Sequence, residues 1–273
     1  MILFPNAKVN LGLNIVSRRT DGYHNIETVF YPINITDILE VVPAAGSEST
    51  LTTYGRTIDC PVEKNLVMKA LRLMQRECGA PEAEIFLNKI IPDGAGLGGG
   101  SADAAFTMLA VNEIFNLGVP QERLASLAAR IGADCPFFIY NRPMMATGIG
   151  DVLTTADVSL KGYRMLLVKS DEISVPTALA YSRVTPKPSD MPIAEILRRP
   201  IGEWQRLLKN DFEPSVFASF PQLAELKAAL LHHGALYAAM SGSGSSVFGI
   251  FDSANMADKV ALEKFGNIFD IQL

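Results

Sequence analysis

Polar and apolar side chains alternate near the start of the chain. In the segment Lys8–Val16 every second residue, beginning with Val9, is apolar, which is the period of a strand that buries one face. Further short strands are predicted at Glu27–Asn34 and Ile38–Val42. The pair Asp21-Gly22 between the first two strands is a typical hairpin-turn sequence. This region is therefore predicted to be rich in short strands.

Apolar residues at intervals of three or four predict helices later in the chain. The segment Lys64–Cys78 has this spacing and is followed by Gly79, a residue that favours helix ends. Other helices are predicted at residues 102–116, 121–131, 204–210, 221–233 and 254–265, and other strands at residues 83–90 and 163–168. Because strands and helices are interspersed without strict alternation, the pattern favours an α+β fold. More polar sequence near Val152 predicts two domains, residues 1–152 and 153–273.

Composition narrows the class of protein. Of the 273 residues, 48% are hydrophobic and 19% are charged, which excludes an intrinsically disordered chain. The net charge of −5 disfavours binding to nucleic acid or to an anionic membrane surface. The three cysteines lack the spacing of a metal or redox motif and are expected to be reduced. With neither a signal sequence nor a long apolar segment, the protein is predicted to be cytoplasmic.

The most informative segment is a glycine-rich stretch between a predicted strand and a predicted helix. Gly94-Ala-Gly-Leu-Gly-Gly-Gly-Ser101 has five glycines in its first seven residues, so its backbone N–H groups can converge without hindrance from side chains. The helix that follows adds unpaired N–H groups and the positive end of its dipole. This combination predicts a site for a phosphate group, with a flexible turn as the alternative.

Two common phosphate loops fit this segment incompletely. Gly94, Gly96 and Gly99 match the dinucleotide-binding pattern G-x-G-x-x-G, but the loop does not follow the first strand. The acidic residue at nearly the required distance, Glu113, lies inside the predicted helix. The spacing of a P-loop is also matched, except that Gly100 stands where the lysine is required. The segment is therefore interpreted as a third kind of phosphate loop.

Three segments, in the same order, resemble the motifs of the GHMP kinases, which phosphorylate small molecules such as galactose, homoserine and mevalonate. They are Asn6-Ala-Lys-Val-Asn10, the segment from Pro92 to Ala104, and Met240-Ser-Gly-Ser-Gly-Ser-Ser-Val-Phe248. Arg18-Arg-Thr-Asp-Gly-Tyr-His24 and Gly132-Ala-Asp-Cys-Pro-Phe137 resemble the branch whose acceptor is a methylerythritol with a diphosphocytidyl group. The resemblance spans nearly the whole chain. It departs from the usual pattern at Ala95 and at Ala102-Asp103, where the family more often has Gly and Ser-Asn.

The resemblance implies a two-domain kinase. The first domain is expected to have a ribosomal S5 domain 2-like fold, and the second a ferredoxin-like sandwich that contributes to the substrate site. The implied reaction transfers the γ-phosphoryl group of ATP to the 2-hydroxyl of the methylerythritol unit, in non-mevalonate isoprenoid biosynthesis. The alternatives are a homoserine or mevalonate kinase, a nucleotide-binding protein without catalysis, and a dinucleotide oxidoreductase.

Asp134 and Lys8 match the catalytic aspartate and the active-site lysine of the family. An aspartate can accept the proton of the attacking hydroxyl and hold its oxygen in line with the γ-phosphorus. A lysine beside it would keep the carboxylate ionised and stabilise charge on the transferring group. The alternatives are a turn or helix-end aspartate and a solvated strand lysine. Asn10, a predicted substrate-binding residue, leaves its strand on the same side as Lys8.

The resemblance also implies where the cytosine base binds. Tyr23 and His24 match the residues that hold it, since a tyrosine ring can stack on a pyrimidine and an imidazole can bond its edge. Tyr181 aligns with the aromatic residue on the other face of the base. Without the resemblance, Tyr23 and His24 would be ordinary hairpin residues. The other predicted substrate-binding residues are Thr177, Gly242 and Ser243.

The remaining predicted residues concern ATP and its metal ion. Asn65, Leu66 and Lys89 align with positions on the adenine side, with a helix N-terminus and a strand-end lysine as the alternatives. Ser101 is a candidate Mg²⁺ ligand, because the ion screens the phosphates. The predicted partner is a small molecule with a cytidine diphosphate group, and the chain is expected to be a monomer or a weak homodimer. The residues predicted to contact the nucleotide along the loop are Pro92, Asp93, Gly94, Ala95, Gly96, Leu97, Gly98, Gly99, Gly100, Ser101 and Ala102.

Overall fold

The computed structural model describes residues 1–254 and 259–273, which form two compact units. The first unit comprises Met1–Ala7, Ile35–Asp93 and Gly98–Arg142. The second unit comprises Lys8–Asn34, Gly94–Leu97 and Pro143–Leu273. The chain therefore passes from one unit to the other several times, and the glycine-rich loop contributes residues to both. The domain boundary near Val152 stays a prediction.

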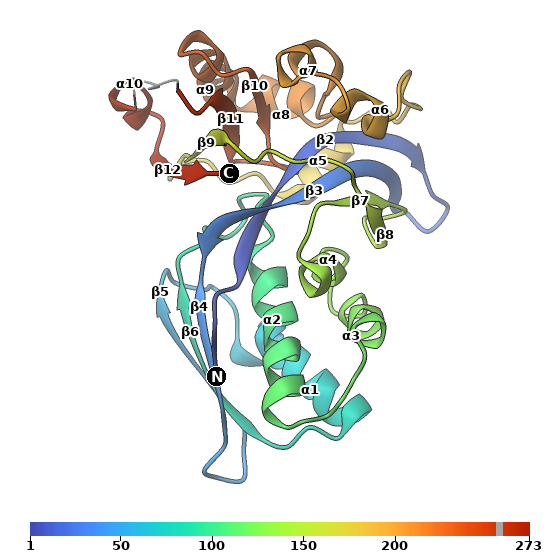
Figure 1. Cartoon of the computed structure of the whole chain (residues 1–273), viewed down its shortest axis with the longest axis vertical. Coiled ribbons are helices and arrows are strands. Elements are labelled where there is room, and N and C mark those ends of the chain that lie inside the picture. Colours follow the sequence, from blue (N-terminus) through green and yellow to red (C-terminus); the bar gives the residue numbers. More distant parts are fainter. Residues whose placement is uncertain (255–258) are drawn as a thin grey trace. The chain divides into compact units, whose positions relative to one another are not determined.

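The first unit is built on a four-stranded sheet with helices against one face (Figure 1). Along β6 (Ala83–Lys89) every second residue, beginning with Ala83, is buried. The buried side of the sheet packs against α2 (Gly99–Ile114), which packs in turn against α1 (Leu66–Cys78). The order of the strands is β1 (Ile2–Leu3), β4 (Ile38–Pro43), β6 and β5 (Thr50–Gly55), and the unit also contains η1 (Val62–Lys64), α3 (Gln121–Ala128) and α4 (Cys135–Tyr140).

Helix α1 shows how local sequence sets the ends of an element. Asn65 lies at its N-cap and accepts a hydrogen bond from the N–H of Val67 at 2.9 Å. Gly79 ends the helix with a φ of +70°, and its N–H bonds back to the carbonyl of Gln75. The predicted position of this helix is therefore confirmed, with a start two residues later than expected.

The two longest strands, β2 (Asn6–Arg18) and β3 (His24–Thr36), belong to another four-stranded sheet. Its order is β2, β3, β7 (Met144–Thr147) and β8 (Val152–Thr155). The turn between β2 and β3 is closed by a hydrogen bond from the N–H of Arg19 to the carbonyl of Tyr23 at 2.8 Å. Gly22 has a φ of +88°, a conformation that glycine adopts readily. The hairpin predicted from Asp21-Gly22 is confirmed.

The second unit also contains an antiparallel sheet with helices against it. Its order is β10 (Tyr237–Met240), β11 (Val247–Asp252), β9 (Tyr163–Lys169) and β12 (Asn267–Gln272). Helix α9 (Pro221–His232) packs on β10 and β11, and its leucines join the buried core below them. The other helices are α5 (Thr177–Ser182), α6 (Ile193–Leu197), α7 (Ile201–Leu207), α8 (Glu213–Ser219) and α10 (Val260–Glu263). In the described part of the chain, no helix is both long and apolar enough to cross a membrane.

The α+β class is confirmed, but several predicted boundaries are wrong. Helix α2 begins at Gly99 and not at Ala102, because two glycines take helical backbone directly after Gly98 turns the chain. Helix α7 ends at Leu207, since Leu208 is extended. Helix α3 ends at Ala128, before residue 131. Helix α10 covers Val260–Glu263 of the predicted 254–265, and residues 255–258 lie outside the described residues.

Candidate active site

The glycine-rich loop leads directly into the amino-terminus of α2. Gly94, Gly96 and Gly98 have φ angles of +60°, +76° and +73°, a region that other residues rarely adopt. Gly98 lies at the N-cap and has no side chain to accept hydrogen bonds from the first turn of this helix. Such N–H groups, at the positive end of a helix dipole, bind anions. The backbone therefore fits the predicted phosphate site.

Three apolar side chains of the loop and of the start of α2 face the protein interior. Ala95, Leu97 and Ala102 are each at most 1% exposed. The departures from the family pattern at Ala95 and Ala102 therefore lie where space is limited. These residues can offer a ligand only their backbone atoms. Pro92 is also buried, whereas Asp93 is exposed.

A second glycine-rich segment packs against the first. A Cβ at Gly96 would lie only 2.0 Å from the carbonyl oxygen of Ser241, so no larger residue fits there. The hydroxyl of Ser241 donates to the carbonyl of Gly96 at 2.9 Å, and the N–H of Ser246 donates to the carbonyl of Ala95 at 3.2 Å. These contacts hold the second glycine-rich segment directly against the loop.

Asn210 anchors this second segment and was missed by the sequence analysis. Its Nδ2 donates to the carbonyls of Met240 and Gly242, both at 2.8 Å, and the residue is 3% exposed. The neighbouring Asp211 accepts from the N–H of Ile15 at 2.8 Å. The local sequence offers no clear signal for this contact, because the charged Lys209 precedes Asn210 and nothing nearby marks it as buried.

Lys8 and Asn10 lie together on β2, as the alternating pattern predicted. The ammonium of Lys8 donates to Oδ1 of Asn10 at 2.7 Å and to the carbonyl of Gly96 at 3.1 Å. It also lies 5.0 Å from the ring centre of Phe30. Lys8 is only 4% exposed, so the alternative of a solvated strand lysine is wrong. Its charge lies directly beside the glycine-rich loop.

Asp134 lies immediately before α4, at the N-cap position. Its side chain makes no capping hydrogen bond to that helix. An N-cap aspartate is recognised by a bond from its carboxylate to the first turn, so the helix-capping alternative lacks its defining contact. The aspartate belongs to the first unit and Lys8 to the second. The catalytic role of Asp134 stays a prediction.

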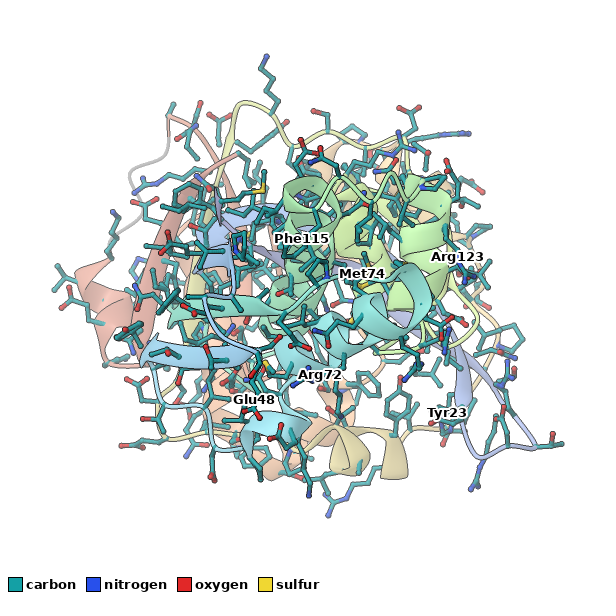
Figure 2. The ribbon with its side chains drawn as sticks, turned by 90° about the horizontal axis from the view of Figure 1, so that it is seen from below. Tyr23, Glu48, Arg72, Met74, Phe115 and Arg123 are labelled. Carbon is teal, nitrogen blue, oxygen red and sulfur yellow. The ribbon has the colours of Figure 1, made fainter. Side chains whose placement is uncertain are left out.

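The aromatic residues predicted to hold the base are arranged differently from the expectation. The rings of His24 and Tyr181 stack on each other, with centroids 5.0 Å apart and planes 24° apart. Tyr181 also meets Phe212 edge to face at 4.7 Å. Tyr23 is 61% exposed at the end of the hairpin (Figure 2). Tyr181 therefore stacks on His24 in this structure. The ring of Tyr23 is exposed, and a cytosine base could stack on it.

The hydroxyls of Thr177 and Ser243 are 3.2 Å apart, within hydrogen-bonding distance. Thr177 is the first residue of α5, and Ser243 lies in the second glycine-rich segment. A Cβ at the adjacent Gly242 would lie 3.3 Å from Oδ1 of Asn10. Four of the predicted substrate-binding residues thus line one region of the second unit.

Asn65 and Leu66, predicted to lie on the adenine side, both make contacts that stabilise the fold. The side-chain oxygen of Asn65 caps α1, which confirms the helix N-terminus proposed as its alternative role. A side chain of Leu66 lies 3.6 Å from where a Cβ of Gly100 would be, so it packs beside the start of α2. Their contact with adenine stays a prediction.

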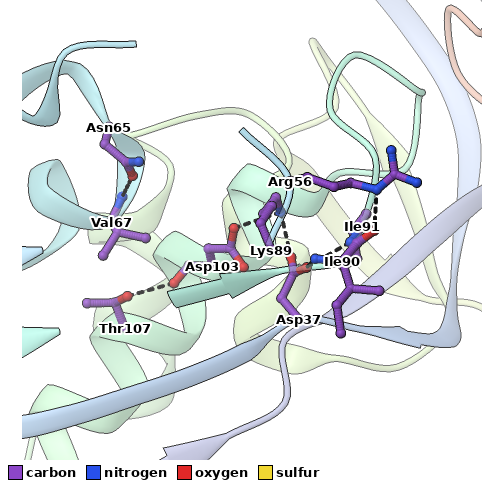
Figure 3. A network of polar contacts seen from close by, with 9 residues as sticks. All are labelled: Asp37, Arg56, Asn65, Val67, Lys89, Ile90, Ile91, Asp103 and Thr107. Atoms are coloured by element: carbon purple, nitrogen blue, oxygen red, sulfur yellow. Dashed lines mark hydrogen bonds and ion pairs between the residues drawn. The ribbon is translucent and has the colours of Figure 1, made fainter. Parts of the chain in front are cut away.

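The side chain of Lys89 forms ion pairs inside the protein. Its ammonium contacts the carboxylates of Asp37 and Asp103 and is 1% exposed (Figure 3). Burial raises the pKa of Asp103 to about 8, whereas the two carboxylates outweigh burial and raise the pKa of Lys89. Because the whole residue is only 2% exposed, Lys89 offers an adenine base almost no accessible surface, and its contact with adenine stays a prediction.

The Ser101 hydroxyl lies in the first turn of α2. A hydroxyl oxygen is a suitable ligand for Mg²⁺, which prefers oxygen donors and keeps several waters or phosphate oxygens. In the described ranges, no group of three or more His, Cys, Asp or Glu side chains could hold a metal ion. The residues present fit an ion that arrives with the phosphates of a nucleotide.

Family comparison gives two matches. Residues 65–142 match the model of the GHMP kinases N terminal domain, and residues 193–264 match that of the GHMP kinases C terminal. A 4-diphosphocytidyl-2-C-methyl-D-erythritol kinase of Parabacteroides distasonis is 53% identical over 92% of this chain and 92% of its own length. The chain belongs to this family of GHMP kinases. A relative of the same name from Bacteroides fragilis is 50% identical over 96% of each chain.

Solved structures agree with this assignment. A crystal structure of a 4-(cytidine 5'-diphospho)-2C-methyl-D-erythritol kinase covers 99% of this chain with a TM-score of 0.84 and 34% identity, and 98% of that chain is covered. A homoserine kinase from Cytophaga hutchinsonii has a TM-score of 0.74 at 19% identity, with 98% and 94% of the two chains covered. The second likeness shows the fold alone. The chain is therefore an ATP-dependent phosphotransferase with the GHMP kinase fold.

The kinase's cysteines should differ sharply in reactivity. Burial raises the pKa of Cys135 to about 12, and the residue is fully buried, whereas Cys60 is exposed. Because the thiolate is the nucleophile, we expect iodoacetamide near neutral pH to label Cys60 in the native protein and to leave Cys135 unlabelled. Peptide mapping by mass spectrometry checks this. Labelling of native Cys135 as fast as Cys60 would contradict it.

Proposed function

We propose that this kinase transfers the γ-phosphoryl group of ATP to the 2-hydroxyl of 4-diphosphocytidyl-2-C-methyl-D-erythritol, a step of non-mevalonate isoprenoid biosynthesis. The observation that carries the proposal is its similarity, over more than nine-tenths of both chains, to relatives that bear this enzyme's name. The paired glycine-rich segments and the Tyr23-His24 hairpin support separate sites for the nucleotide and for the cytidine group.

In the proposed reaction the 2-hydroxyl oxygen forms a bond to the γ-phosphorus. The bond from that phosphorus to the β–γ bridging oxygen breaks, and ADP leaves. Asp134 accepts the proton of the hydroxyl as its oxygen attacks. A carboxylate that is not used to cap α4 supports this role.

Lys8 supplies positive charge for the transferring group. Its ammonium is held in place by Asn10 and by the carbonyl of Gly96, so little reorganisation is needed during the reaction. Burial removes competing water, which strengthens the interaction of this charge with a phosphoryl oxygen. The N–H groups of the loop and of α2 bind the other phosphate oxygens.

Mg²⁺ belongs to the proposal as the counter-ion of ATP. The ion would neutralise charge that develops on the phosphate oxygens. Ser101 is the residue that would contribute a ligand oxygen, since its hydroxyl lies in the first turn of α2. Phosphate oxygens and water would complete the coordination shell.

Replacement of Tyr23 with alanine tests the substrate class. If the exposed ring stacks on cytosine, its loss removes roughly 1–3 kcal/mol of base binding, as for other aromatic–base stacks. Stacking on the base should stabilise the bound ground state and the transition state equally, because the base does not take part in the reaction. The KM for the cytidine substrate should therefore rise about 5- to 150-fold, with kcat and the KM for ATP much less changed. Steady-state kinetics with each substrate varied measures this.

Tyr54→Ala is the matched control, because Tyr54 is 56% exposed on β5 and lies outside the proposed site. CDP should protect the wild-type protein and Tyr54→Ala against thermal unfolding, and protect Tyr23→Ala much less. Equal protection of all three proteins would remove Tyr23 from the cytidine site. A homoserine or mevalonate kinase has no base to bind, so absence of CDP protection in the wild type would favour those alternatives.

Three further features complete the proposal. The enzyme acts in the cytoplasm as a monomer or weak homodimer, with residues 1–152 and 153–273 as its domains. It has no nucleic-acid or membrane partner. The net charge of −5 supports the absence of a nucleic-acid or anionic-membrane partner.

A further inference from the structure

A buried cluster of three ionisable side chains, Lys89, Asp37 and Asp103, lies in the first unit. The ammonium of Lys89 lies 2.5 Å from a carboxylate oxygen of Asp37 and 2.8 Å from one of Asp103 (Figure 3). The three side chains are 1%, 0% and 3% exposed, respectively. Charged groups are rarely buried so completely, because removing them from water is costly unless every partner is well placed. Such a cluster therefore fixes the segments that carry it.

Asp37 holds the backbone that enters the glycine-rich loop. Its second oxygen accepts from the N–H of Ile90 at 2.5 Å and from the N–H of Ile91 at 2.8 Å. These two residues directly follow β6 and precede the loop. Arg56 donates to the carbonyl of Ile90 at 3.1 Å, so this peptide is fixed on both sides. One carboxylate thus sets the direction in which the chain leaves the sheet.

The same cluster reaches the other end of the loop. Asp103 lies on α2, and its carboxylate faces Lys89 from the helix side. A Cβ at Gly99 would lie 2.8 Å from Nζ of Lys89 and 2.8 Å from a methyl carbon of Ile91. Gly99, the first residue of α2, therefore packs against the ammonium of Lys89 and against Ile91, whose backbone is bound by Asp37. A buried positive charge lies directly beneath the first turn whose N–H groups bind the anion.

The two carboxylates are not equivalent. Asp37 accepts three hydrogen bonds, one from the ammonium and two from the backbone. Asp103 accepts one bond, from Lys89, and its other oxygen is buried without a partner in the described residues. An asparagine at position 103 could still accept from Lys89. At position 37 an amide would turn an N–H donor toward groups that are themselves donors.

We propose that Asp37 is a positioning residue for the nucleotide, because it sets the glycine-rich loop through Ile90, Ile91 and the Lys89 ammonium beneath Gly99. The proposal rests on the proposed role of the loop in binding ATP. Asp37 itself is buried and touches neither substrate. Its loss should therefore act on ATP alone and leave the cytidine substrate unaffected.

The test is Asp37→Asn in the full-length enzyme. We expect the KM for ATP to rise about 10- to 100-fold, the range that follows from small displacements of a binding group, with the KM for the cytidine substrate within about twofold. Asp103→Asn should give a smaller rise, about two- to threefold, since it leaves the bonds of Asp37 in place. Asp270→Asn is the control for loss of an ion-paired carboxylate, because Asp270 pairs with Arg164 on the second unit's sheet.

A folding defect is separated by a second measurement. Thermal unfolding with CDP and with a non-hydrolysable ATP analogue reports each site in the fraction that folds. If Asp37→Asn does not fold, Asp37→Glu retains the charge while moving the carboxylate. It should lose protection by the ATP analogue and keep protection by CDP. Equal loss of both protections, or an unchanged KM for ATP in a folded Asp37 variant, would overturn the proposal.

Failure of the underlying function would look different. Gly96→Ala disturbs the loop without touching Asp37. If Gly96→Ala raises the KM for ATP and Asp37→Asn does not, the positioning role alone is wrong. If neither variant changes the KM for ATP, the loop is not the nucleotide site, and both proposals are wrong.

Discussion

Replacement of Asp134 with asparagine should lower kcat about 10²- to 10⁴-fold, the usual loss on removing a general base. A neutral amide keeps the size of the side chain but cannot accept the proton of the 2-hydroxyl. Because the carboxylate does not cap α4, its loss should leave that helix in place. The measurement is the steady-state rate of phosphoryl transfer at saturating concentrations of both substrates.

Asp157→Asn is the matched control, since Asp157 is exposed and lies outside the proposed site. It should keep wild-type turnover. The KM values of Asp134→Asn should change far less than its kcat, because the proton is transferred only in the transition state. A correctly folded Asp134→Asn enzyme with near-normal kcat would show that another group removes the proton.

Gly96→Ala should lower kcat/KM for ATP about 100-fold or more, comparable to other losses caused by misplaced binding groups. The new Cβ would lie 2.0 Å from the carbonyl oxygen of Ser241, and the residue has a φ of +76°. A shift of either backbone that relieves this clash would also disturb the bond from the Ser241 hydroxyl to the Gly96 carbonyl. The loop must therefore change shape, and with it the positions of its N–H groups.

Gly118→Ala is the control that separates the steric clash from the cost of a positive φ at a residue other than glycine. Gly118 has a similar φ of +64°, but a Cβ there would meet nothing within 4 Å. Gly118→Ala should therefore cost some stability and leave ATP kinetics unchanged. Isothermal titration of each variant with an ATP analogue and with CDP completes the test. Equal losses for Gly96→Ala and Gly118→Ala would mean that the Ser241 contact does not shape the site.

Local sequence predicted the parts of the site that depend on short-range geometry. A period of two placed Lys8 and Asn10 on one side of β2, and their side chains do meet. The glycine run predicted a loop that leads directly into a helix, and the predicted start of α2 lies within three residues of the observed one. In each case the information lies within a few neighbouring residues.

Contacts between distant segments could not be predicted in this way. The alternation of Ala83, Ile85 and Leu87 on β6 places Lys89 on the same buried face, which already implies a charged partner. Nothing local identifies that partner as Asp37, which is 52 residues away. The stacking of His24 on Tyr181 depends in the same way on tertiary packing.

The bond between Ser241 and Gly96 joins residues 145 positions apart, and it has a consequence for synthesis. The second glycine-rich segment lies between β10 and β11. A ribosome that has made the glycine-rich loop must therefore still add these two strands before the loop can make its contacts with that segment. Contacts of such long range also form late in folding, since they close large loops. A nascent chain should therefore gain affinity for ATP only when it is almost complete.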